Sequence, residues 1–240
     1  MTVFPRVRYN ARSHVGLKRK INEDSVLALP EQSIWVVSDG MGGHAAGDYA
    51  SQLITDMIAS IEPDLPAADR MHALRQTIQN AHQMIRQEAE TRGASVIGAT
   101  VASLMLANSH FVGLWAGDSR IYRLRDGVIQ MLTSDHSIVA TLVESGQMTW
   151  DEAEHHPQSN AITRAVGVGD DLELDKVRGE VQSGDRFLLC SDGLTKYATF
   201  GMLENVLRTE PLETIADRLI QIALDGGGAD NITVVVVDIP

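Results

Sequence analysis

The rest of this chain is organised around Ile34-Trp35-Val36-Val37-Ser38-Asp39-Gly40-Met41-Gly42-Gly43-His44. The first four residues of this stretch form a short apolar run, which predicts a buried strand. The strand ends in a carboxylate, and the glycines after it allow a sharp turn and a close approach of the backbone to a ligand. Apolar side chains at helical spacing then predict a helix over residues 45–61. A single Asp-Gly after a strand is more often a plain turn than a metal site.

An acid beside a strand end occurs four times in this chain, and the recurrence favours a metal site. Apolar strands also lead into Asp118 and Asp192, and a further apolar strand begins just after Asp230. In an antiparallel sheet the end of one strand lies beside the start of its neighbour. We therefore expect these three aspartates and Asp39 to gather on one edge of a sheet. Four converging carboxylates repel one another strongly unless cations neutralise them.

The donor atoms at this edge indicate which metal it would hold. They are all oxygens, which suits hard, six-coordinate Mg²⁺ or Mn²⁺ rather than Zn²⁺. The histidines are scattered along the sequence, and there is no pair of cysteines. The one cysteine, Cys190, lies within an apolar strand, where a buried core thiol is the ordinary interpretation.

Composition limits the classes of function. The net charge of -12 argues against a general nucleic-acid binder, because such proteins neutralise phosphates. One cysteine allows no internal disulfide, and the longest apolar runs are strand-sized, so we expect no membrane partner. Met1–Asn10 lacks the apolar core of a signal peptide, and we expect a cytoplasmic protein. The length of 240 residues allows one large domain or two small ones.

Helical and strand patterns alternate along the chain. Helical spacing also occurs over residues 69–92 and 212–224. The helices over residues 45–61 and 69–92 follow each other closely and suggest a hairpin that lies on a sheet. Between the helices, the middle of the chain has strand patterns with a hairpin around Asp126-Gly127. The segment Ser134–Gly169 is polar, contains only short helical patterns and falls between strands. We expect it to form an insertion over the sheet edge that moves as a flap and affects substrate choice.

Six short motifs occur in the order found in a known family. On these motifs the chain resembles the type 2C metal-dependent serine/threonine phosphatases, of the bacterial stand-alone type, over nearly its whole length. Each motif alone is weak, but six in order are specific. They are Arg19-x-x-Asn22-Glu23-Asp24, Ser38–Gly43, Gly98–Thr100, Gly117–Arg120, Ser191–Leu194 and Asp230–Thr233, and residues 135–137 and 160–167 are similar to the family's flap.

The resemblance implies an α+β fold and a single phosphatase domain over residues 1–240, with the flap at residues 134–169. The implied fold is a four-layer α-β-β-α sandwich, in which helix pairs flank two antiparallel β-sheets. The resemblance also implies two Mn²⁺ or Mg²⁺ ions in a core site and a third, weaker ion.

Site residues carry over from the family motifs one position at a time. By resemblance, Asp39 bridges the two core ions, and the backbone carbonyl of Gly40 is a further ligand. Arg19 matches the arginine that binds the phosphate, and Asp118 matches the position that holds the third ion together with Asp192. The remaining implied residues are Asp192, Asp230 and Glu23 as partners of the metals, Asp24 and Asn231 as their supports, and His136 and Asn160 in the flap.

The implied reaction is hydrolysis of phosphoserine and phosphothreonine by direct attack of a water that two metal ions activate, without a phosphoenzyme. Many eukaryotic members have a histidine directly after the first Asp-Gly, but here that residue is Met41, as in bacterial members. The general acid is therefore unassigned. A metal-bound water is the favoured candidate, and His44 and His136 are weaker ones.

The expected partners are phosphorylated proteins, modified by a cognate bacterial serine/threonine kinase that in some members controls a secretion system. We expect the chain to act as a monomer. One alternative is a catalytically weak module that binds a phosphorylated partner without cleaving it, and the intact Asp39, Asp192 and Asp230 argue against it. Another is a hydrolase of small phosphate esters or nucleotides, for which the sequence shows no obvious base-binding pocket.

Overall fold

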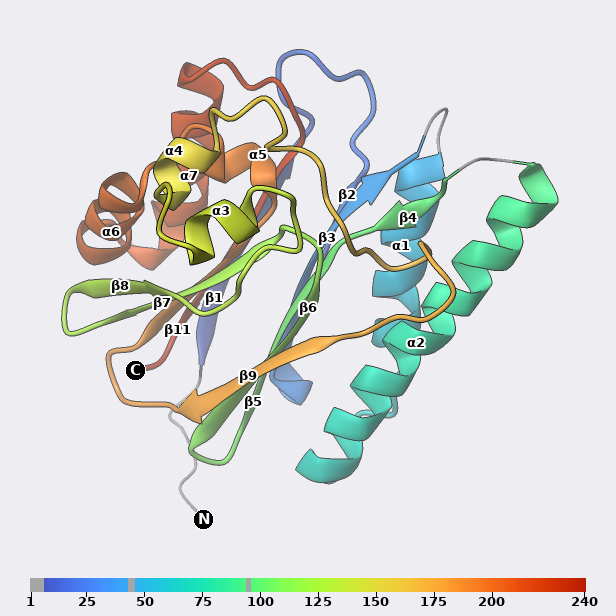
Figure 1. Cartoon of the computed structure of the whole chain (residues 1–240). Coiled ribbons are helices and arrows are strands. Elements are labelled where there is room, and N and C mark those ends of the chain that lie inside the picture. Colours follow the sequence, from blue (N-terminus) through green and yellow to red (C-terminus); the bar gives the residue numbers. More distant parts are fainter. Residues whose placement is uncertain (1–6, 43–45, 94–95) are drawn as a thin grey trace.

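The fold consists of two antiparallel β-sheets packed face to face, with helices on the outer face of each sheet (Figure 1). This computed structural model describes residues 7–42, 46–93 and 96–240. The arrangement confirms the expected α+β class and its two antiparallel sheets.

The first sheet has the strand order β1-β11-β10-β7-β8. Strand β11 lies between β1 and β10, and all seven of its residues are buried, as its apolar sequence predicts. In the tight turn between β7 and β8, Asp126 and Gly127 both have positive φ, as a two-residue hairpin requires. The strands are β1 (Arg8–His14), β7 (Arg120–Arg125), β8 (Val128–Met131), β10 (Arg186–Cys190) and β11 (Ile232–Asp238).

The second sheet has the order β2-β3-β5-β6-β9, and the short β4 also pairs with β3. Strand β3 carries the apolar run and Asp39. Its side chains alternate: Ile34 and Val36 face the helices, whereas Trp35 and Val37 face the first sheet. The strands are β2 (Asp24–Leu29), β3 (Ile34–Met41), β4 (Gly98–Ala99), β5 (Val101–Ala107), β6 (His110–Ala116) and β9 (Asp175–Glu180).

Helix pairs cover the outer faces of the sheets. Helices α1 (Ala46–Ala59) and α2 (Ala67–Arg92) pack on the second sheet, and α6 (Phe200–Thr209) and α7 (Leu212–Asp225) pack on the first. Each pair shares a hydrophobic cluster with its sheet, and a third cluster fills the space between the sheets. Three clusters between four layers confirm the expected sandwich. No helix within the described ranges is both long and apolar enough to cross a membrane.

Among the longer elements, β2 and α6 were absent from the sequence interpretation. Strand β2 begins inside the acidic motif at Asp24, so its first residues suggest a polar loop. Helix α6 was also missed, although Leu203, Val206 and Leu207 have core spacing and are buried. Within residues 134–169 the helical patterns cover residues 137–145 and 149–155, and the helices that form there, α3 (Ala140–Glu144) and α4 (Trp150–Ala153), are shorter.

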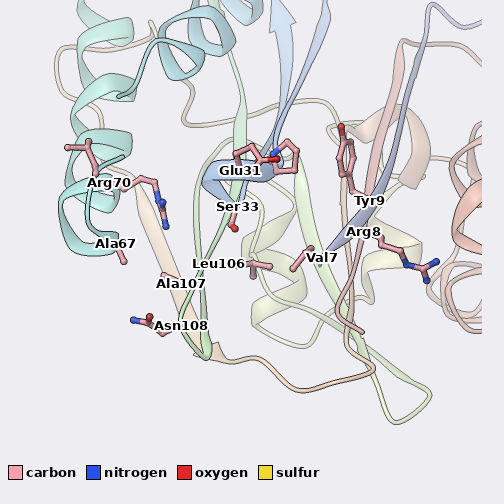
Figure 2. Close-up of a pocket in the computed structure, with 12 residues that line it drawn as sticks. Val7, Arg8, Tyr9, Glu31, Ser33, Ala67, Arg70, Leu106, Ala107 and Asn108 are labelled. Carbon is pink, nitrogen blue, oxygen red and sulfur yellow. The ribbon is translucent and has the colours of Figure 1, made fainter. Parts of the chain in front are cut away.

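One large cavity lies far from the acidic residues of the motifs. It encloses about 890 Å³ between the 3₁₀ turn η1 (Pro30–Gln32), the start of α2 and the turn between β5 and β6. Figure 2 shows the Arg70 side chain reaching from α2 into the space beside Glu31 and Ser33. Because Ser33 precedes β3 and Asp39 lies near the end of that strand, the cavity and Asp39 are at opposite ends of the sandwich.

The core between the sheets offers a direct test of the layered arrangement. Phe187→Ala should lower the free energy of unfolding by about 3–5 kcal/mol, because it removes a fully buried ring that packs on Phe111 and leaves a cavity. Urea denaturation measures this loss. As a control, Val128→Ala, at a side chain that is 64% exposed, should change stability by less than about 0.5 kcal/mol. Equal losses in the two variants would contradict the assignment of this core.

Candidate active site

The acidic residues of the motifs lie at one end of the sandwich and come from both sheets. In the second sheet, Asp39 pairs in register with Asp24. Asp192 follows β10 and opens the short helix α5 (Asp192–Thr195), and Asp230 precedes β11 in the first sheet. Asp118 lies where the chain crosses from β6 to β7. The sequence predicted one sheet edge, and this was wrong in one respect: the acids face one another across two sheets.

A threonine fixes the backbone of the central aspartate. The Asp39 amide donates to Thr100 Oγ1 at 3.0 Å, and the Thr100 amide donates to the Asp39 carbonyl at 2.8 Å. Thr100 Oγ1 also forms a hydrogen bond with Ser119 Oγ at 2.6 Å. Hydrogen bonds through Thr100 therefore link the motif of Asp39 to the motif of Asp118.

Gly40 allows helix α1 to approach β3 closely. A Cβ atom at Gly40 would lie 2.1 Å from the carbonyl oxygen of Gly47, which is too close for any side chain. The Gly40 amide donates to the Glu23 carbonyl at 3.1 Å, and Ser51 Oγ donates to the same carbonyl at 2.6 Å. These contacts place the Glu23 side chain beside Gly47 at the start of α1.

Asn231 holds the loop before β2 at three points. Its Nδ2 donates to the carbonyls of Val15 and Ile21, at 2.9 and 3.0 Å, and its Oδ1 accepts from the Glu23 amide at 2.8 Å. The side chain is buried, so each of these bonds replaces water that cannot reach it. Asn231 thereby fixes the loop that carries Arg19 and Glu23.

Two carboxylates in the site have oxygens without a protein partner. Asp24 accepts a hydrogen bond from Ser191 Oγ at 2.8 Å through Oδ2, but its buried Oδ1 has no partner among the described residues. Asp192 Oδ1 is also buried without one. Burial raises the pKa of Asp24 to about 7, and burial together with the charge of Asp230 raises the pKa of Asp192 to about 6. Buried carboxylate oxygens without donors fit a site for a cation.

Asp39 and Asp118 show the same excess of negative charge. Burial raises the pKa of Asp39 well above its usual value, and the charges of Asp24, Asp192 and Asp118 add to the effect. Burial and the Asp192 charge likewise raise the pKa of Asp118. Over the described ranges, no three acidic, histidine or cysteine side chains enclose an ion as they stand.

Arg19 is the cation of the motifs that contacts these acids. Its Nη2 donates to Asp230 Oδ2 at 2.8 Å, and Nη1 lies 3.9 Å from Glu23 Oε2. Its side chain remains about half exposed, so the guanidinium is at the mouth of the acidic site. This position lets it meet an anion that arrives from solvent.

His136 supports a turn. Its Nδ1 accepts from the Gly117 amide at 3.0 Å, and its ring stacks on Trp115 with the planes 8° apart. Its Nε2 lies 3.3 Å from Asp175 Oδ2 and 3.1 Å from Arg164 Nη1. Both ring nitrogens therefore contact the protein framework, and these contacts suit a residue that positions the loop of Asp118.

Asn160 and Met41 are near the acids. Asn160 is exposed, accepts from Lys196 Nζ at 3.2 Å and lines a small cavity together with Asp118 and Asp192. Met41 packs over Gly98, where an added Cβ would be 3.0 Å from the Met41 Cε. The other candidate for the general acid, His44, lies outside the described residues.

The sequence interpretation did not assign the residue that attaches the flap. Arg120 is buried, and its Nε and Nη2 donate to the Asp135 carboxylate, the shortest contact being 2.7 Å. Its Nη1 is 2.8 Å from Glu154 Oε1, and the guanidinium lies 4.8 Å from the ring centre of Trp150. Glu154 and Trp150 belong to the α4 region of the flap. An arginine two residues after Asp118, followed by acids within the flap, was the available signal.

The Arg120 contacts generate a prediction about the flap. Arg120→Lys keeps the positive charge but cannot contact three groups at once, so amide exchange over residues 140–154 should become faster while β11 is unaffected. Hydrogen–deuterium exchange with mass spectrometry measures both segments. In the wild type, residues 134–169 should already exchange faster than β11. Arg123→Lys on the same strand is the matched control, and equal exchange in all three proteins would contradict the role of Arg120.

Comparison with known proteins assigns the chain to a family. The protein phosphatase 2C family model matches residues 13–231. The serine/threonine protein phosphatase PstP of Mycobacterium tuberculosis is 39% identical over 234 residues, which are 97% of this chain and 45% of that protein. The serine/threonine phosphatase stp of Listeria monocytogenes is 37% identical over 236 residues, which are 95% of this chain and 94% of that one.

Solved structures agree with the sequence comparisons. A structure described as PppA, a key regulatory component of T6SS in Pseudomonas aeruginosa, is 43% identical, covers 98% of both chains and superposes with a TM-score of 0.91. The catalytic domain of PstP in complex with two manganese ions is 38% identical, covers 97% of both chains and has a TM-score of 0.87. This chain spans less than half of full-length PstP but nearly all of the Listeria phosphatase. With its motifs at one end of a double-sheet sandwich, the chain belongs to the protein phosphatase 2C family.

Proposed function

We propose that this protein is a metal-dependent serine/threonine protein phosphatase. One observation carries the proposal: buried carboxylates from two sheets face one another with raised pKa values and with oxygens that have no protein donor. A hard divalent cation is the partner that fits an all-oxygen site of this charge. Relatives that match almost the whole chain are named serine/threonine phosphatases, which supports the substrate class.

In this proposal Asp39, Asp192 and Asp230 hold two Mn²⁺ or Mg²⁺ ions, with the Gly40 carbonyl and Glu23 as further partners. When bound, the two ions supply Lewis acidity, which polarises phosphate oxygens and lowers the pKa of water. The PstP structure with two manganese ions supports this number. The third ion, with Asp118 as its distinguishing partner, is a further part of the proposal.

The protein's own groups bind and orient the substrate. Arg19 carries five N–H donors in a planar fork, and its bond to Asp230 leaves donors that can grip two phosphate oxygens. Asn231 fixes the backbone on both sides of Arg19, so the guanidinium needs little ordering when the phosphate arrives. The hydrogen bond from Ser191 to Asp24 joins the two sheets beside the acids and helps to hold them in place.

The partners follow from the substrate class. We propose that the substrates are proteins phosphorylated by a cognate bacterial serine/threonine kinase, in the cytoplasm, where a single buried cysteine stays reduced. The description of PppA as a regulatory component of T6SS makes secretion-system proteins one group of substrates to test.

The first functional prediction concerns Asp39. Asp39→Asn keeps the shape of the side chain but removes charge from the site, so turnover of a phosphothreonine peptide with Mn²⁺ should fall at least about a hundredfold. Steady-state kinetics measures turnover. Thermal denaturation adds a second readout: Mn²⁺ should raise the melting temperature of the wild type and raise it less in the variant.

A matched control separates this effect from loss of charge in general. Asp64→Asn removes one charge from an exposed position between α1 and α2 and should leave both readouts unchanged. Full peptide turnover by wild-type protein after exhaustive chelation, with no metal found by elemental analysis, would refute the proposal. If the wild type hydrolyses p-nitrophenyl phosphate but cleaves no phosphopeptide, the result would favour the alternative of a small phosphate-ester hydrolase.

The second functional prediction tests the third ion. If Asp118 holds it, Asp118→Ala should leave two Mn²⁺ ions bound and the melting temperature nearly unchanged, while peptide turnover falls strongly. Titration calorimetry and kinetics measure these quantities. If Asp118 only fixes the turn between β6 and β7, stability should fall and kcat per folded molecule should hold. Unchanged kcat would therefore exclude the third-ion role.

A further inference from the structure

The loop over residues 15–23 presents three consecutive cations on an acidic protein. Lys18, Arg19 and Lys20 are all exposed, in a chain with 32 acidic residues and 20 lysines and arginines. Arg19 bonds to Asp230, as described above. Within the described part of the chain, Lys18 and Lys20 form no ion pair. Charged side chains that contact only water are an ordinary surface feature. What distinguishes this loop is the way its backbone is held.

The backbone of this loop is fixed at both ends. Asn231 binds the carbonyls of Val15 and Ile21, and the Leu17 amide donates to the Gly228 carbonyl at 2.7 Å. Gly16 has a φ of 82°, and a Cβ there would lie 2.1 Å from the Asp230 carbonyl oxygen, so the loop lies directly on the chain before β11. A surface that is already ordered loses little entropy when a partner binds.

Two apolar side chains flank the cations on this fixed backbone. Leu17 is 60% exposed and Ile21 is 51% exposed, one on each side of Lys18-Arg19-Lys20. Single exposed apolar residues are common and need no explanation. These two lie within two residues of the arginine proposed to bind the phosphate, so they are close enough to contact a peptide bound there.

We propose that residues 17–21 recognise the peptide around the phosphorylated residue. Lys18 and Lys20 pair with acidic side chains next to the phosphoserine or phosphothreonine, and Leu17 and Ile21 contact an apolar side chain of the same segment. The inference rests on the proposed function, because Arg19 sets the position of the phosphate beside the lysines. It specifies the substrate class further: phosphorylated segments rich in acidic residues.

An anionic membrane is a poorer fit to this surface. Recognition of anionic lipid usually needs a cluster of 4–8 basic residues, whereas here two lysines lie beside an arginine that Asp230 already engages. The net charge of -12 also repels an extended anionic surface. A peptide segment needs only the local charge, because it contacts the loop alone.

The test compares two phosphothreonine peptides that differ only in having glutamates or glutamines on both sides of the phosphothreonine. The wild type should prefer the glutamate peptide by about fivefold in kcat/KM, mostly through KM, because two exposed ion pairs contribute modestly. The preference should shrink as sodium chloride screens the pairs. Lys18→Gln/Lys20→Gln should cleave the two peptides equally. Each rate is divided by the rate of that variant on p-nitrophenyl phosphate, so a loss of active protein cancels.

The matched control removes the same two charges elsewhere. Lys176→Gln/Arg178→Gln lies at exposed positions of β9, the outer strand of the second sheet, and should keep the full preference. Equal cleavage of both peptides by the wild type, or a preference that survives in the Lys18/Lys20 variant, would overturn the inference and leave the proposed function standing. Binding to phosphatidylserine vesicles that needs Lys18 and Lys20, without any peptide preference, would also overturn it. A wild type that cleaves no phosphopeptide would remove the proposed function and this inference together.

Discussion

Repulsion between buried carboxylates is the constraint on which the rest of this structure depends. Asp24, Asp39, Asp118 and Asp192 have pKa values above their usual range because they are buried close to one another. Left to themselves, such groups would separate or take up protons. The framework prevents the first outcome, since the amide and carbonyl of Asp39 are hydrogen-bonded to the Thr100 hydroxyl and amide, and Asp24 lies in a strand pair. The site is therefore held in place against its own charge, and neutralisation by a cation stabilises it.

The acids come from both sheets, so the geometry of the site depends on how the sheets pack. At the acidic end, polar bonds cross between the layers, such as Ser191 to Asp24 at 2.8 Å. Further along, the contact between the sheets becomes apolar and includes the Phe111 and Phe187 rings, whose centres are 5.1 Å apart. A sandwich that is rigid at its apolar centre can fix carboxylates at its polar end, which neither sheet could do alone.

The sequence predicted the strands and helices whose apolar pattern extends over many residues. It also placed Asp39, Asp118, Asp192 and Asp230 beside strand ends. It predicted one sheet edge where there are two sheets, because periodicity shows which face of a strand is buried but not which strands are neighbours. It passed over β2, whose first residue, Asp24, is polar because it belongs to the site. It assigned no role to Arg120, because the sequence does not show which acids of the flap, here Asp135 and Glu154, meet it in the folded protein.

Charge sets a further requirement on any phosphate that reaches this site. This protein has a net charge of -12 and several acids at one end of the sandwich. It therefore repels a phosphorylated segment at long range. Local positive charge has to reverse that field, and the loop before β2 supplies it at the mouth of the site, where Arg19 is about half exposed. Its bond to Asp230 joins the cationic loop directly to the acidic cluster, so any change in the charge at Asp230 alters how firmly Arg19 is held. In the proposed function, binding of a cation by the acids and binding of a phosphate by Arg19 would therefore be coupled through one carboxylate, which links the two halves of the site energetically.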